Sequence, residues 1–540
     1  MNNRFRIPLY MAAALLALIL HQRWQEAQQP PAPALPSLSA PVASTANPDY
    51  IEVETDQLKL WINRKGGAVE RVDLLNYSRS LKDKQPLSLL KPENPNRFML
   101  QHGLINRANP AASVPLDAPY TSAQTQYRLG DAAELPVTLT WKNDDFTLEK
   151  TYRFKRGSFA FELEQKLDNH SAGSWEGFGF TRLVFGQPAG RGGMGQIAAY
   201  TGGVFSGPAD RYEKIPLKDM NDKANRAGKE ETSGWVALLQ HYFLGAIVTP
   251  PDTKRLNFTN INAAGDHEIG VSGAPQTVAP GESYRFQNQI YLGPKIQDDL
   301  KALAPDLDKT VDYGFLFMLA QPMFKVLQAI HGLLGNWGWS IVLMTLLIKV
   351  LFFVPNAWGY KSMAKMRKIA PEMQRLKERF GDDRQAYAQA MGELFRREKA
   401  NPARGCLPML LQVPFFLAFY WMLAETVELR QAPWFGWIQD LSAMDPYFIL
   451  PAINACLMYL TQKLNPPPTD PMQAKIMQYM PWFFGFMFMW FPAGLVLYWS
   501  VNNAFNIVQQ SLMNKRYGSN TPPPTLGKQQ RAIRAANDNG

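Results

Sequence analysis

The chain has 540 residues, of which 46% are apolar, and a formal net charge of +10. Its length allows three or four soluble domains, but the apolar runs gather at the extreme N-terminus and after Tyr313. Both cysteines, Cys406 and Cys456, lie in the apolar runs after Tyr313, so the stretch from about Tyr50 to Asp308 has no disulfide framework.

The positive charge is concentrated in two segments that flank apolar runs. Residues 358–405 carry 12 Lys and Arg against 6 Asp and Glu, and residues 514–540 carry 5 against 1. Because basic segments beside membrane spans stay on the cytoplasmic side, we expect both in the cytoplasm. An anionic partner, such as ribosomal RNA or lipid headgroups, is compatible with this charge.

Residues 1–24 predict a transmembrane anchor. Arg4 and Arg6 precede an apolar run over residues 7–20, a pattern that signal peptides and uncleaved anchors share. No small-residue cleavage site follows, which favours an anchor with a cytoplasmic N-terminus. Residues 25–48 are rich in Pro, Ala and Ser, a composition typical of an extended linker.

Residues 49–310 predict a large external β-sandwich. Apolar and polar residues alternate with period two in stretches such as 58–62 and 159–163. The glycine-rich stretch 190–195 lacks the Lys-Ser/Thr ending of a phosphate loop, and no two histidines have metal-ligand spacing. We interpret the domain as a binding or scaffolding module and predict no cofactor or metal.

Residues 311–335 are apolar enough to span a membrane, but a polar stripe argues otherwise. Gln321, Lys325 and Gln328 recur at helical spacing. A span here would also place the basic segment 358–405 outside, against its charge. The pattern therefore favours an amphipathic helix that lies in the membrane interface.

Residues 336–358 predict the second span as one helix, since about 20 apolar residues cross a bilayer. Lys349 lies near its middle, where a cation normally faces a bundle interior or a water-filled cavity. No Asp or Glu lies near the middle of the later spans, so we predict no permanent ion pair for Lys349. We expect it to attract an anionic group that arrives and leaves.

The remaining chain predicts a cytoplasmic helical hairpin at 359–404, four more spans within 405–513 and a basic cytoplasmic tail at 514–540. With the anchor, this makes six transmembrane helices with both termini in the cytoplasm. The predicted fold is a multi-domain membrane protein with a five-helix core and a large external β-sandwich.

Polar side chains of the spans predict a hydrophilic groove beside Lys349. Thr345 lies one helical turn before it, and Gln412 lies in the third span. Ordinary interhelical hydrogen bonds, worth about 0.6 kcal/mol each, explain the amides singly but not an unpaired cation. Met487 belongs to a group of methionines that either fill the core or form an adaptable apolar surface. One face of the last span carries Trp499, Asn502, Asn503, Asn506 and Gln510.

Six short motifs, weak singly and strong together, carry a family resemblance. They are WGWS at 337–340, SMAKM at 362–366, NP at 401–402 with GC at 405–406, ELRQAP at 428–433, DPMQ at 470–473 and FPAGL at 491–495. The chain resembles the YidC-type membrane protein insertases of Gram-negative bacteria, which are related to oxidase-assembly proteins. The resemblance covers nearly the full length.

This resemblance implies an inner-membrane insertase and chaperone with a periplasmic β-supersandwich. Its groove, open to the cytoplasm and lipid, receives the hydrophilic outer segment of a nascent protein, with no covalent chemistry. The implied partners are nascent membrane proteins, the Sec translocon, lipids, and the ribosome and signal-recognition-particle receptor at the hairpin and tail; DNA is not one. The implied substrate contacts are Gln412, Val413, Phe416, Met487 and Trp499.

Two positions differ from the usual family pattern. The family usually has Arg where this chain has Lys349, and more often Tyr where it has Trp499. Lys keeps the charge but lacks the two-pronged fork with which Arg binds a carboxylate.

Two other functions compete with insertion. A secondary transporter would use Lys349 as its coupling group, but the missing carboxylates and the lack of an evident inverted repeat disfavour it. An anchored envelope enzyme acting on sugars fits a β-sandwich, but no pair of carboxylates stands out and the membrane half would be unexplained.

Overall fold

The fold is that of a computed structural model. It describes residues 49–517 except 94–95, 109–112, 187–198, 209, 223–228, 381–382, 399–402 and 465–470. The predicted anchor at 1–24, the linker at 25–48, the glycine-rich stretch 190–195 and the tail beyond residue 517 lie outside the described residues.

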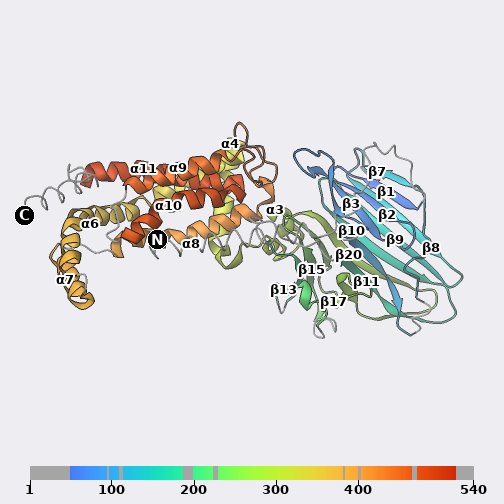
Figure 1. The fold of residues 1–540 in the computed structure, drawn as a ribbon. Helices are drawn as coiled ribbons and strands as arrows, with labels where there is room; N and C mark the ends of the chain where they lie inside the picture. The colour runs from blue at the N-terminus through green and yellow to red at the C-terminus, as the bar shows by residue number, and fades with distance from the viewer. Residues whose placement is uncertain are drawn as a thin grey trace, which may run out of the picture. The chain divides into compact units, whose positions relative to one another are not determined.

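The first half of the described chain forms two large β-sheets (Figure 1). In spatial order, one contains β14 (Lys229–Glu231), β17 (Arg255–Ile261), β18 (His267–Gly273), β11 (Trp175–Phe185), β5 (Phe98–Asn106), β3 (Val69–Ser78), β2 (Leu58–Asn63), β1 (Tyr50–Glu54) and β7 (Gln126–Arg128), with β4 (Pro86–Leu90) beside β3 and β19 (Gln276–Val278) beside β11. The other contains β13 (Glu213–Pro216), β12 (Gly202–Ser206), β15 (Gly234–Leu239), β16 (Phe243–Thr249), β20 (Ser283–Pro294), β10 (Ala160–Asn169), β9 (Phe146–Lys155), β8 (Glu134–Lys142) and β6 (Thr121–Ser122).

Both sheets contribute to one apolar core. Buried and half-buried residues alternate along β2 and β10, as the period-two pattern predicted. Leu60 and Leu100 from one sheet and Leu163 and Ile290 from the other are all buried in this core. The β-sheet-rich domain that the sequence predicted is therefore present.

A buried lysine connects the two sheets. Lys150 on β9 is 2% exposed, and its Nζ donates to the carbonyl oxygens of Gly66 at 2.6 Å and His102 at 3.1 Å. Gly66 has φ +87° in the turn between β2 and β3, a conformation that favours glycine. Nζ also lies 4.7 Å from the centre of the Tyr120 ring. Burial lowers the pKa of Lys150 to about 7.

We predict that replacing Lys150 with Met changes how stability depends on pH. In the unfolded chain this lysine regains its ordinary pKa of 10.5. Burial of the charged lysine therefore destabilises the wild type by its full amount below pH about 7, where both states are protonated, and not at all above about 10.5, where both are neutral. Stability of the wild type relative to Lys150→Met should thus rise between these values, by at most about 1.4 kcal/mol per pH unit. Thermal unfolding of both full-length proteins in detergent between pH 6.5 and 9.5 measures this; a constant difference would contradict it.

The second half of the described chain is helical. A connector with α3 (Gln297–Leu303), η4 (Leu307–Thr310) and η5 (Gly314–Leu316) leads to α4 (Phe317–Leu334), α5 (Trp337–Leu351), α6 (Phe353–Phe380), α7 (Arg384–Arg397), α8 (Ala403–Glu425), η6 (Val427–Leu429), α9 (Ile449–Leu464), α10 (Pro471–Met487), η7 (Phe488–Trp490) and α11 (Ala493–Tyr517). One short helix, η3 (Leu217–Asp219), lies among the strands.

Local signals explain the boundary between α4 and α5. Gly335 follows α4 in the left-handed conformation, with φ +64°, and its N–H donates to the carbonyl of His331. The Asn336 side chain then caps α5 by accepting from the N–H of Trp339 at 3.0 Å. One buried face of α4 carries Met323, Phe324, Leu327 and Ile330, as expected of an amphipathic helix.

The single helix predicted over 336–358 is wrong. The structure ends α5 at Leu351 and begins α6 at Phe353, with a 60° bend between α5 and the start of α6. Pro355 supplies the reason, because it has no N–H to donate to the carbonyl of Leu351 and its ring crowds that carbonyl.

By length and composition, no single helix among the described residues suffices to cross a membrane. The bent pair Trp337–Leu351 and Phe353–Ser362 suffices when taken together, and Leu410–Glu425 is a shorter apolar helix.

The predicted helical hairpin corresponds to α6 and α7, which pack together. Asp383 caps α7 by accepting from the N–H groups of Gln385 and Ala386. Ile369 and Leu394 form the buried centre of a small separate core. Its border is formed by Met366, Met373, Leu376, Met391 and Phe395.

Candidate functional site

The candidate site begins at Lys349, which α5 places in the interior of the helices. The residue is 1% exposed, and its Nζ donates to Oδ1 of Asn506 on α11 at 2.9 Å. Within the described part of the chain, no carboxylate oxygen lies within 4.0 Å of Nζ. The lysine is not unpaired, because a neutral amide accepts from it.

Thr345 is also buried one turn before Lys349, but its hydroxyl is already used. It donates to the carbonyl of Ile341, four residues earlier in α5, at 2.6 Å. The threonine hydroxyl is therefore bonded within its own helix and is not a direct partner of the lysine.

A second part of the site joins α8 to α11 through an amide pair and aromatic rings. Gln412 Nε2 lies 3.5 Å from Asn502 Oδ1, at the limit of a hydrogen bond. The ring of Phe416 lies 4.5 Å from that of Trp499, which lies 4.5 Å from Phe488. The structure therefore brings Gln412, Phe416 and Trp499 together.

Other predicted residues lie elsewhere. Asn503 is buried against α9, where its Nδ2 donates to Oδ1 of Asn454 at 3.0 Å. Val413 is 39% exposed on α8. Met487 ends α10 and packs, partly buried, against the core beside Phe488.

Two contributors were not identified from the sequence. Asn506 was on the predicted polar face, but nothing local marked it as the acceptor for Lys349. Phe488 follows α10 in a short helical turn, and it is fully buried between the rings of Phe491 and Trp499. Its contacts depend on the packing of distant segments, so an apolar residue in an apolar run gave no signal.

The C-terminal end of α8 carries a different kind of buried lysine contact. Lys295, which precedes α3, lies 3.6 Å from Glu425 at the end of α8, with side chains 1% and 6% exposed. Burial lowers the pKa of Lys295, and Glu425 opposes that shift. His241 Nε2 also lies 2.8 Å from the carbonyl oxygen of Ala424. These contacts tie the β-sheet domain to α8.

Comparison with known proteins identifies the family. The model for the YidC periplasmic domain matches residues 50–326, and that for the 60Kd inner membrane protein matches residues 329–520. The chain belongs to the YidC family. It is therefore similar to membrane proteins with a periplasmic domain.

Two relatives match over most of their length. A membrane protein insertase YidC of Marinobacter nauticus is 44% identical, over 90% of this chain and 88% of its own. One of Azotobacter vinelandii is 41% identical, over 93% of this chain and 96% of its own. A crystal structure titled as an active YidC insertase aligns with a TM-score of 0.38 and 17% identity, over 85% of this chain and 92% of that one.

We predict that breaking the Lys295–Glu425 pair singly is costly and that removing both charges restores most of the loss. Glu425→Leu leaves Lys295 buried without its partner, which costs about 3–5 kcal/mol, whereas Lys295→Met with Glu425→Leu leaves no buried charge. Denaturant unfolding of the full-length proteins in detergent measures these losses.

The exposed pair of Lys155 and Glu162, 3.4 Å apart, provides the control. Lys155→Met should cost less than about 1 kcal/mol. If the losses of the two single variants at the buried pair simply add in the double variant, the pair is not coupled.

Proposed function

We propose that this chain inserts nascent integral membrane proteins into the inner membrane and assists their folding, and that a hydrophilic groove around Lys349 receives the substrate's polar outer segment. Its relatives carry the name membrane protein insertase, a role without covalent chemistry. The observation that carries the groove proposal is the contact of a buried cation with a neutral amide.

The chemistry of that contact suits transient binding. An ammonium has three N–H donors, and the amide of Asn506 takes one of them without cancelling the charge. An acidic side chain that enters the groove gains a charge-assisted hydrogen bond, which is about twice as strong as a neutral one. Because Asn506 can accept from Lys349 again, the substrate leaves without stranding a buried cation.

The apolar part of a substrate needs a neighbouring surface. Phe416 and Trp499 form an aromatic surface beside Gln412, and Val413 is exposed on the same helix, α8. Met487 adds a side chain that adapts to different partners. We propose that the substrate helix moves along this surface into lipid, driven by burial of its apolar residues, each worth about 0.3–0.6 kcal/mol in mid-membrane.

The proposed topology places six spans in the membrane, with both termini in the cytoplasm and the β-sheet domain in the periplasm. The basic exposed surface of α6 and α7 then faces the cytoplasm, where it suits the ribosome, the signal-recognition-particle receptor and lipid headgroups. We also propose cooperation with the Sec translocon. A secondary transporter is less favoured, because its coupling chemistry usually needs intramembrane carboxylates near the cation.

Site-specific crosslinking tests the substrate path. We expect benzoylphenylalanine at Val413 or Met487 to form adducts with a ribosome-stalled single-span protein. An exposed position of the β-sheet domain, Leu116, serves as the control and should give none. Adducts at the control but not at the two groove positions would contradict the path.

The electrostatic part has its own test. We expect Lys349→Ala to reduce insertion of substrates with acidic outer segments about tenfold and of matched neutral substrates much less, because only the former lose a charge-assisted bond. The exposed lysine of α4, Lys325, gives the control variant Lys325→Ala. Protease protection of the outer segment measures insertion, and equal losses for both substrates would exclude the electrostatic role.

A further inference from the structure

Lys349 lies in the last turn of α5, directly before a sharp break in the chain of helices. α5 ends at Leu351, and α6 begins at Phe353 at 60° to it. Because a helix carries its side chains in fixed directions, the angle of this break decides where the Lys349 ammonium lies relative to the neighbouring helices. Pro355 interrupts the backbone hydrogen bonds here, so contacts with other helices must hold the angle.

The first residue after the break is bound by α11. Nε2 of Gln509, a residue that is 1% exposed, donates to the carbonyl oxygen of Phe353 at 3.1 Å. Gln509 lies three residues after Asn506, so the two amides project from one face of α11, about 4.5 Å apart along its axis. Asn506 binds Lys349 before the break, and Gln509 binds α6 after it. One helix therefore holds both sides of the break.

A second contact at the break is aromatic. The ring of Phe352, between the two helices, lies 4.9 Å from the ring of Phe415 on α8, in an edge-to-face arrangement. Ring pairs remain favourable over a wide range of separations and tilts, whereas a hydrogen bond weakens steeply when its angle changes. The angle of the break therefore depends more on Gln509 than on the ring pair.

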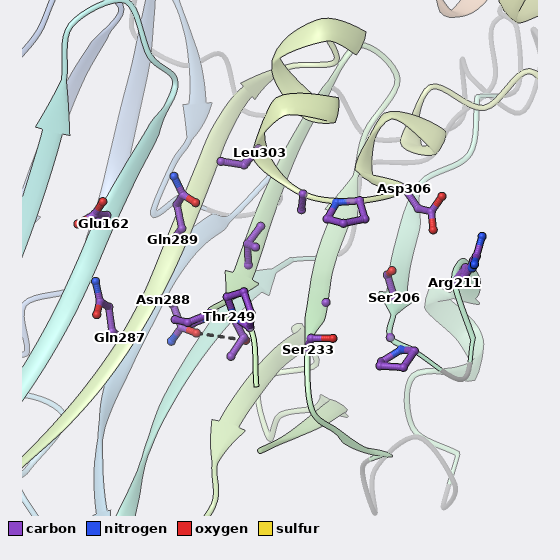
Figure 2. Close-up of a pocket in the computed structure, with 18 residues that line it drawn as sticks. Glu162, Ser206, Arg211, Ser233, Thr249, Gln287, Asn288, Gln289, Leu303 and Asp306 are labelled. Carbon is purple, nitrogen blue, oxygen red and sulfur yellow. Dashed lines mark hydrogen bonds between the residues drawn. The ribbon is translucent and has the colours of Figure 1, made fainter. Parts of the chain in front are cut away.

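The amide of Gln509 is present at a cost to stability. Its Oε1 is buried and has no hydrogen-bond partner among the described residues. In contrast, Asn288, which Figure 2 shows beside a pocket of the β-sheet domain, uses both ends of its amide: Oδ1 accepts from Thr249 at 3.3 Å, and Nδ2 donates to Thr181 at 3.2 Å. A buried acceptor without a partner destabilises a fold, and an apolar side chain of similar volume would avoid this. The contact of Gln509 with α6 therefore points to a role beyond stability.

We propose that Gln509 is a positioning residue of the groove. Through the carbonyl of Phe353 it sets the angle between α5 and α6, and it thereby holds the Lys349 ammonium where an acidic segment of a substrate can reach it. This inference deepens the proposed function and rests on it, because the angle matters for insertion only if Lys349 attracts the substrate. A variant without this contact keeps the charge but not its fixed place, so acidic substrates should be the ones affected.

Insertion of matched acidic and neutral single-span substrates by the full-length protein tests this role, with protease protection of the outer segment as the measurement. Gln509→Met removes the donor at nearly constant volume. We expect insertion to fall about fivefold for the acidic substrate and less than about twofold for the neutral one, because the loss corresponds to about one hydrogen bond.

The adjacent amide provides a matched control. Gln510 is 2% exposed, and its Nε2 donates at 3.1 Å to the carbonyl of Leu464 on α9, away from the break. Gln510→Met should therefore change insertion of the acidic and the neutral substrate by the same factor.

A double variant separates positioning from general stability. Lys349→Ala with Gln509→Met should disfavour the acidic substrate no more than Lys349→Ala alone, because Gln509 acts through the lysine. If Gln509→Met does not accumulate in the membrane, Gln509→Asn replaces it, since an amide one methylene shorter does not reach the carbonyl of Phe353.

Two results would overturn the positioning role and leave the proposed function intact, provided that Lys349→Ala itself disfavours acidic substrates. The first is an equal loss for both substrates in the Gln509 variant. The second is a preference for neutral substrates that grows further in the double variant. If Lys349→Ala instead affects both substrates equally, the electrostatic part of the proposed function fails, and the positioning role fails with it.

Discussion

The contact between Lys349 and Asn506 constrains the helical half of the molecule. A buried cation needs hydrogen-bond acceptors, so α11 must present its amide-bearing face to α5. The same face carries Asn502 one turn earlier and Trp499 two turns earlier, and this places them against Gln412 and Phe416 of α8, respectively. Contacts of one face of α11 therefore join α5 and α8 around the charge.

Much of this arrangement follows from local sequence patterns. Period-two alternation predicted the β-sheets, and the polar stripe from Gln321 predicted that α4 is amphipathic. The break after α5 was also present in the sequence, since Pro355 removes a hydrogen bond to Leu351. The apolar run concealed it, because hydropathy measures burial and not backbone continuity.

Pairings between distant segments were not predictable in the same way. Asn503 and Asn506 lie on one helical face, yet one contacts Asn454 of α9 and the other Lys349 of α5. Helical periodicity gives a direction for each side chain but not the identity of the neighbouring helix.

Three buried lysines have partners of different chemistry. Lys295 faces a carboxylate, so its charge is compensated and the contact holds two parts of the molecule together. Lys150 meets two carbonyls and a ring, and burial has lowered its pKa. Lys349 has one neutral acceptor among the described residues. A carboxylate beside Lys349 would form a permanent ion pair and would compete with any acidic substrate. The neutral amide of Asn506 instead accepts a hydrogen bond and leaves the positive charge able to attract an anion.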